Sequence, residues 1–174
     1  KNFVFFGRIN QHKNILLLIN SFIAAKLGDD WKLKIYGISD DLILEKEILK
    51  ISKINNNIQI LKPVFEKKKI NIINSSWLNV LVSKSEILSL SILEAYLYGL
   101  PSLISKNFNF EISPSNVFQC DNNVLSISKK FRHISNWSES QRKEIQKKII
   151  SNFNIKKYND KIINQYLSAF NKID

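Results

Sequence analysis

Short apolar runs alternate with amphipathic stretches along the chain. The runs have the length and composition of buried strands, and they fall near residues 3–6, 32–36, 58–61, 78–82, 101–104 and 117–119. The intervening stretches have the pattern of helices, near residues 15–26, 42–53, 67–75, 91–98, 124–132, 138–152 and 156–171. Apolar strands separated by helices are typical of a parallel sheet covered on both faces. The pattern therefore predicts an α/β fold, a doubly wound (Rossmann-like) parallel sheet with helices on both faces.

Length and composition fit one domain. The chain has 174 residues, of which 44% are hydrophobic, and this is enough to bury a sizeable core. We expect a single domain over residues 1–174, ending in a helix at 156–171. The apolar stripe of that helix must pack against another surface. The chain lacks methionine even at position 1, which suggests a domain excised from a longer protein.

The first strand-loop-helix unit places two cations where its strand ends. The apolar run 3–6 ends at Gly7, and Arg8 and Lys13 follow in the loop before the next helix. Glycine permits a sharp exit from a strand, and open α/β sheets bind ligands at the carboxyl ends of their strands. A forked cation and a point cation there could neutralise a diphosphate. Taken singly, both are also the ordinary solvated cations of a loop.

A later strand-loop-helix unit carries two carboxylates around the start of its helix. Glu86 lies in a hydroxyl-rich loop, and Glu94 lies one turn into the helix. The backbone N–H groups of Ser89, Leu90 and Ser91 come at the positive end of the helix dipole, which favours an anion. Glu94 is placed to accept hydrogen bonds from two hydroxyl groups, such as those of a ribose diol. The unit predicts a site for a phosphate-bearing ligand.

These carboxylates and the acidic pairs also have structural interpretations. Ser91 and Glu94 have the spacing of a capping box, in which each satisfies the other's backbone donor. Glu86 alone reads as a solvated loop carboxylate. The adjacent pair Asp40 and Asp41 reads as the cap of the helix that begins at residue 42.

The chain is strongly basic, with a formal net charge of +11 and a pI near 9.7. Such a charge attracts polyanions, either nucleic acid or an anionic membrane surface. The lysines are scattered over several predicted helices, which favours solvated helix faces, so no nucleic-acid partner is expected. Peripheral association with a membrane stays open.

Other features exclude some classes of protein. A single cysteine, Cys120, excludes an intramolecular disulfide. No apolar run approaches the roughly 20 residues that span a bilayer, and no signal peptide is seen. We therefore expect a cytoplasmic protein, or one peripheral at the inner face of the membrane. No Asp-x-Asp motif or His/Cys cluster has the spacing of a metal site, so no metal is expected.

Taken in order, the two units resemble the C-terminal, donor-binding domain of a group 1 (family 4) glycosyltransferase of the GT-B fold. The resemblance spans nearly the whole chain. It rests on the Glu-x7-Glu motif of Glu86 and Glu94, on the loop with Gly7, Arg8 and Lys13, and on the helix ending Tyr98-Gly99-Leu100-Pro101. It departs from many members at two positions, where serine and leucine stand in place of a glycine and an aromatic residue (Ser89, Leu88).

The resemblance implies transfer of a sugar from a nucleotide-diphosphate sugar, linked to UDP, GDP or ADP, with retention and without a cofactor or metal. Arg8 and Lys13 match the pair that holds the diphosphate leaving group. Glu94 matches the carboxylate that grips the ribose, and Glu86 matches the one near the donor sugar. The phosphate turn corresponds to the backbone of residues 89–91. By the same resemblance the base is bordered by three residues, Gly37, Pro63 and Val64.

In that family an N-terminal domain supplies the acceptor site, and the chain begins at the first strand of the donor domain. The resemblance therefore implies a glycan or lipid-linked glycan acceptor, bound through an absent half. We expect the isolated chain to bind nucleotide but to transfer sugar negligibly. Three alternatives stay open: a nucleotide-sugar epimerase of related fold, a basic nucleic-acid-binding module and a non-catalytic relative.

Overall fold

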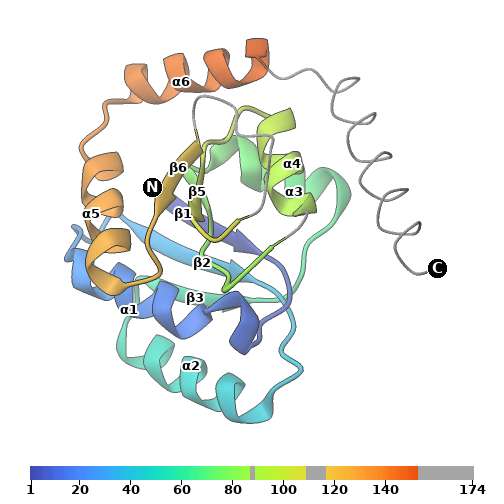
Figure 1. The fold of residues 1–174 in the computed structure, drawn as a ribbon, viewed down its shortest axis with the longest axis vertical. Helices are drawn as coiled ribbons and strands as arrows, with labels where there is room; N and C mark the ends of the chain where they lie inside the picture. The colour runs from blue at the N-terminus through green and yellow to red at the C-terminus, as the bar shows by residue number, and fades with distance from the viewer. Residues whose placement is uncertain (87–88, 109–116, 153–174) are drawn as a thin grey trace.

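The computed structural model describes residues 1–86, 89–108 and 117–152. Its centre is a sheet of six parallel strands in the order β3-β2-β1-β4-β5-β6 (Figure 1). The strands are β1 (Asn2–Phe6), β2 (Lys32–Tyr36), β3 (Ile58–Leu61), β4 (Leu78–Leu81), β5 (Ser102–Ser105) and β6 (Val117–Cys120). All six predicted strands are found within two residues of their predicted bounds.

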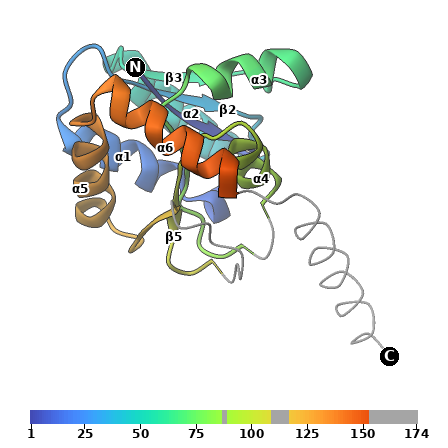
Figure 2. The ribbon, with the colours of Figure 1, turned by 90° about the horizontal axis from the view of Figure 1, so that it is seen from above.

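Helices cover both faces of this sheet, which confirms the predicted doubly wound α/β fold. They are α1 (Ile15–Ala25), α2 (Leu42–Ile54), α3 (Glu66–Ser75), α4 (Leu90–Leu97), α5 (Val124–Ser135) and α6 (Glu139–Asn152). Helices α1 and α5 lie side by side, and α6 passes across the molecule to reach α4 (Figures 1 and 2). The predicted helix at 156–171 lies outside the described residues. Within the described part of the chain, no helix is both long and apolar enough to cross a membrane.

The central strand β1 divides the core into two layers. Its side chains alternate between the faces of the sheet, as in any strand. Phe3 and Phe5 belong to the larger buried cluster, which includes residues of α1, α2 and α5. Val4 and Phe6 belong to a smaller cluster with Ile73 of α3. Because both faces of β1 are buried, the strand reads as a continuous apolar run rather than an alternating one.

The helix ends follow the sequence signals, with one exception. Asp41 caps α2 as predicted, since its side chain accepts hydrogen bonds at 3.0 Å from two backbone N–H groups of the first turn. Gly99 follows α4 with a φ of 73°, a left-handed conformation that glycine adopts without strain. Gly28 follows the predicted helix at 15–26 and would be expected to end it, but α1 already ends at Ala25, and Lys26 takes the left-handed position with a φ of 50°.

The strand order reverses between β1 and β4. The chain moves outward from β1 through β2 to β3, returns to pair β4 with the other edge of β1, and then continues outward to β6. The carboxyl ends of β1 and β4 therefore lie next to each other, and the loops that leave them turn apart. In open α/β sheets this is where a crevice forms and ligands bind.

Candidate functional site

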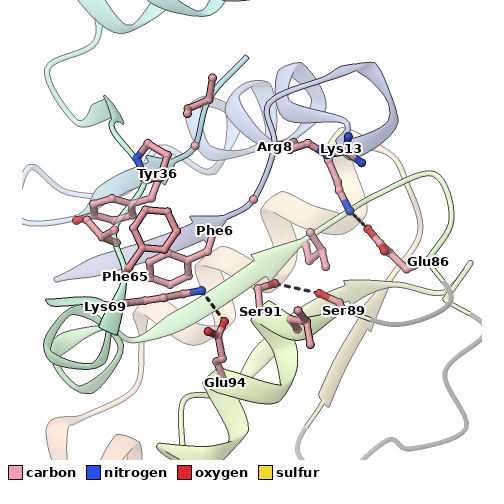
Figure 3. Close-up of a pocket in the computed structure, with 17 residues that line it drawn as sticks. Phe6, Arg8, Lys13, Tyr36, Phe65, Lys69, Glu86, Ser89, Ser91 and Glu94 are labelled. Atoms are coloured by element: carbon pink, nitrogen blue, oxygen red, sulfur yellow. Dashed lines mark hydrogen bonds and ion pairs between the residues drawn. The ribbon is translucent and has the colours of Figure 1, made fainter. Parts of the chain in front are cut away.

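A cavity of about 550 Å³ opens at the carboxyl ends of β1, β2 and β4 (Figure 3). Eleven of the residues that line it were singled out from the sequence, namely Gly7, Arg8, Lys13, Gly37, Pro63, Val64, Glu86, Ser89, Leu90, Ser91 and Glu94. The fold thus brings together the two strand-loop-helix units and the segments at residues 37 and 63–64. Arg8, Lys13 and the serine hydroxyls lie toward one end of the cavity, and the aromatic rings lie at the other, with Lys69 beside them (Figure 3).

The first loop of the cavity is shaped by a short 3-10 helix over Gln11–Lys13, in a stretch that the sequence indicated only as a loop. Asn10 caps this turn, and its side chain accepts a hydrogen bond from the backbone N–H of Lys13 at 3.2 Å. Asn14 follows in a left-handed conformation with a φ of 53° and donates to the Val82 carbonyl at 3.0 Å. These bonds fix where the Lys13 side chain leaves the loop.

The Lys13 ammonium forms an ion pair with the Glu86 carboxylate. Their side chains are only 19% and 10% exposed, and the Ser83 hydroxyl donates a further hydrogen bond to Glu86 at 2.9 Å. His12 Nε2 donates to the Ser85 carbonyl at 2.7 Å. Interpreting Glu86 as a solvated loop carboxylate was wrong, because the folded chain covers it and pairs it with a residue 73 positions away.

Arg8 lies at the same end of the cavity, and its charge is not paired with that of any described residue. It is exposed, and among the described residues it has neither an ion pair nor a hydrogen bond. Its guanidinium can therefore turn toward an anion in the cavity without breaking an existing contact. Lys13, by contrast, is shared between Glu86 and whatever ligand enters.

Helix α4 begins beside these cations. Ser89 is its N-cap residue, and the Ser89 and Ser91 hydroxyls form a hydrogen bond with each other at 3.0 Å. The capping box proposed for Ser91 and Glu94 was wrong, because the N-cap residue is Ser89, two positions before Ser91, and Glu94 is then the fifth residue of the helix rather than the third. The first N–H groups of a helix have no acceptor within the helix, and those of Leu90 and Ser91 belong to residues that line the cavity.

Glu94 is held by a residue that the sequence analysis did not single out. Lys69, on α3, places its ammonium 2.5 Å from Glu94 Oε2 and 5.1 Å from the centroid of the Phe6 ring (Figure 3). Lys69 stands third in a run of three lysines, which reads as a solvated helix face. Its side chain is nevertheless only 18% exposed.

Aromatic rings form the other end of the cavity. Phe6 and Tyr36 stack with their centroids 5.3 Å apart and their planes 16° apart, and burial raises the pKa of the Tyr36 hydroxyl. Phe65, the N-cap residue of α3, lines the same region and is 73% exposed. The sequence analysis missed these rings, because Phe6 and Tyr36 read as strand residues of the core. Their position as the last residues of adjacent strands was the available signal.

No metal-binding cluster accompanies these groups. Over residues 1–86, 89–108 and 117–152, no group of three or more His, Cys, Asp or Glu side chains is arranged to hold a metal ion.

The fold and the position of the cavity define a Rossmann-like α/β domain with a ligand cleft at the reversal of strand order. Over residues 1–149 the chain matches the model of the family "Glycosyl transferases group 1". The chain therefore belongs to the group 1 glycosyl transferases, and the alternative of an epimerase is set aside. A comparison with curated protein sequences gives no significant match.

Solved structures share this fold at low sequence identity. The C-terminal domain of a group 1 family glycosyl transferase (LpcC) from Francisella tularensis has a TM-score of 0.74 and 19% identity, over 86% of this chain and 82% of that one. HepE from Anabaena, in complex with UDP and glucose, has a TM-score of 0.76 and 16% identity, over 96% and 48%. The catalytic domain of starch synthase IV from Arabidopsis thaliana, bound to ADP and acarbose, has a TM-score of 0.75 and 15% identity, over 98% and 38%. The chain thus spans about half or less of the length of the last two proteins.

Proposed function

We propose that this chain is the donor-binding half of a retaining glycosyltransferase, which transfers a sugar from a nucleotide-diphosphate sugar to an acceptor. The observation that carries the proposal is the order of groups along one cavity. The cations and the start of α4 lie between two carboxylates, Glu86 and Glu94, and exposed aromatic surface lies at the far end of the cavity. A diphosphate flanked by a sugar and a nucleoside has the same order of charge and polarity.

The diphosphate would lie between the first loop and the start of α4. Arg8 offers a free forked cation and Lys13 a point charge, and the N–H groups at the helix start add a positive dipole. When the bond between the anomeric carbon and the phosphate oxygen breaks, negative charge grows on the leaving diphosphate. Lys13 and the N–H groups at the helix start are held in place and stabilise that charge, and Arg8 can turn toward it.

Glu86 would face the donor sugar. Its carboxylate is covered, and Lys13 and Ser83 hold it in one place, so it can accept hydrogen bonds from sugar hydroxyls. It can also stabilise the positive charge that develops at the anomeric carbon. Its ion pair with Lys13 would couple the sugar end of the donor to the phosphate end.

Glu94 would accept hydrogen bonds from the ribose hydroxyls, with the base beyond it. Phe65 offers an exposed ring face to a base, and the backbone at Gly37 and at residues 63–64 offers polar groups beside it. Two of the solved structures of this fold carry UDP or ADP, which supports a nucleoside diphosphate as the ligand class.

The acceptor would be bound by a second domain. We propose a glycan or lipid-linked glycan, reached at the inner face of a membrane to which the net charge of +11 would draw the protein. Residues 1–174 would then form one domain that binds the donor. On its own this domain would bind nucleotide and transfer sugar at a negligible rate.

Thermal unfolding with UDP, GDP and ADP tests the proposal. A ligand present at 100 times its dissociation constant stabilises the fold by about 2.7 kcal/mol, so one nucleotide should raise the melting temperature in a saturable way. Glu94→Ala should abolish most of that shift. Glu47→Ala, which removes an exposed carboxylate on α2, should leave it unchanged. The absence of any nucleotide shift, together with salt-sensitive binding of a duplex oligonucleotide, would overturn the proposal in favour of a nucleic-acid-binding module.

A further inference from the structure

We infer that Lys69 is a positioning residue for ribose recognition, which acts by holding the Glu94 carboxylate in place. This inference rests on the proposed function, because it concerns how the nucleotide's ribose is recognised. Lys69 stands in the second turn of α3 and Glu94 in α4, so the pair joins two helices that are separate in the sequence. Lys69 Nζ lies 2.5 Å from Glu94 Oε2.

The exposures of the two side chains indicate which of them meets the ligand. Lys69 is 18% exposed and Glu94 is 38% exposed. The ammonium is also covered by the Phe6 ring, whose centroid lies 5.1 Å away. The lysine is therefore held from two sides behind the carboxylate, and the carboxylate presents the more open surface of the pair to the cavity.

The chemistry of a carboxylate allows one ion pair and a diol at the same time. A carboxylate offers about four lone-pair positions, and Lys69 uses a single one, on Oε2. Two hydroxyl groups can take others, so a ribose would not have to displace the lysine. A ligand that meets a fixed acceptor avoids the free-energy cost of ordering a rotamer-rich side chain.

Glu94 does not occupy the start of α4. It is the fifth residue of the helix, beyond the third position from which a glutamate reaches back to the N-cap N–H, and its carboxylate pairs with Lys69 of α3. The N–H groups at the start of α4 therefore stay available for a phosphate.

Two variants distinguish this role from that of an ordinary surface lysine. Lys69→Met keeps the length of the side chain and removes the charge, whereas Lys69→Arg keeps the charge. Lys68→Met is the matched control, because Lys68 is the preceding residue on α3 and is exposed. Thermal unfolding without ligand shows whether each variant is folded, and Lys69→Arg keeps the test decisive if Lys69→Met is not.

Isothermal titration should use UDP, GDP or ADP, whichever binds the parent chain best, with its 2′,3′-dideoxy analogue and inorganic pyrophosphate. Lys69→Met should weaken the binding of the nucleoside diphosphate by about tenfold. This is the loss of affinity expected when a charged hydrogen-bond acceptor is no longer held in place. Its affinity for the dideoxy analogue and for pyrophosphate should change by less than about twofold. Lys69→Arg should restore most of the loss, and Lys68→Met should have no effect.

The pair should also be coupled. In a Glu94→Ala background, Lys69→Met should cause no further loss of nucleotide affinity, because its effect passes through the missing carboxylate. If Lys69→Met lost as much affinity for pyrophosphate and for the dideoxynucleotide as for the nucleotide, the inference would be overturned and Lys69 would be a phosphate ligand. An unchanged affinity for the nucleotide in Lys69→Met would overturn it too. A parent chain that binds none of the three nucleotides would overturn the proposed function itself, and this inference with it.

Discussion

Both carboxylates of the cavity are held by lysines that come from distant parts of the sequence. Glu86 pairs with Lys13, and Glu94 pairs with Lys69. Each pair is partly covered, so its charges are screened less by water than those of an exposed pair. In the absence of ligand, the negative side chains of the site are thus already compensated and ordered, and Arg8 stays free to meet an incoming anion.

Outside the cavity, the buried thiol of Cys120 predicts how the stability of the fold depends on pH. Its thiol is buried and donates to the Ile104 carbonyl at 3.3 Å, and burial raises its pKa from 9.0 to about 12. The unfolded chain therefore releases this proton at lower pH than the folded chain does. Below pH 9.0 the thiol has no effect on the pH dependence of stability, and between pH 9.0 and about 12 it makes stability fall as the pH rises.

Thiol labelling and urea unfolding check this prediction. At pH 8 an aromatic disulfide reagent should leave the folded protein unlabelled and should label one thiol after denaturation. Cys120→Ala should lose less stability than the parent between pH 8 and pH 10.5. Rapid labelling of the folded chain would show that Cys120 is not buried as described.

At the scale of strands and helices, the loops that leave β1 and β2 lie against each other at two glycines, Gly7 and Gly37. A Cβ atom added to Gly37 would lie 2.1 Å from the Gly7 carbonyl oxygen, a distance that the backbone cannot tolerate. The close approach itself is secured by hydrogen bonds on both sides, from Gly7 N–H to the Tyr36 carbonyl and from Gly37 N–H to the Leu61 carbonyl. Gly37 thus serves the cavity through its lack of a side chain.

Gly37→Ala should therefore destabilise the fold by about 1–3 kcal/mol, the usual cost of overpacking, and should weaken nucleotide binding. Gly28→Ala is the matched control, because a Cβ atom there would meet only the Asp30 side chain, at 3.3 Å. Urea unfolding and nucleotide titration of both variants check the prediction. Equal stability of the two variants would contradict the close approach.

The sequence predicted elements more completely than contacts. The central strands β1 and β4 could be found because they are buried on both faces, whereas β2 could be found by its alternation of lysines with buried apolar residues. Asp41 could be identified as a cap because capping depends only on neighbours in the sequence. Lys69 could not be identified, since its partner Glu94 lies 25 residues away and only the fold brings them together. The capping box failed because the serine-rich start offers two N-cap candidates, and the helix uses Ser89 rather than Ser91.

Across the chain as a whole, the cavity draws its cations and carboxylates from different parts of the sheet. Arg8, Lys13 and Lys69 come from the segment that runs from β1 to α3, whereas Glu86 and Glu94 come from the segment that continues from β4. A nucleotide bound between them would contact both halves. Its binding energy should therefore stabilise the complete fold rather than one part of it.

Hydrogen exchange with and without the bound nucleotide tests this expectation. The slowest amides of β2 and those of β5, on opposite sides of the strand reversal, should be protected by the same factor. At 100 times the dissociation constant that factor is about 100. The Glu94→Ala variant under the same conditions gives the control. Protection confined to one half would mean that the halves open independently and that the ligand holds only one of them.

The separation of opposite charges along the chain has a consequence for synthesis. A nascent chain that has emerged only as far as α3 carries the three cations of the cavity but neither of its carboxylates, nor the helix start beside them. Chains emerge from the ribosome at about 5–20 residues per second, beginning with the N-terminal part. The nucleotide pocket would thus be completed seconds after its first half emerges, once β4 pairs with β1 and α4 folds. Occupancy by nucleotide would then mark a chain whose central strands have been joined.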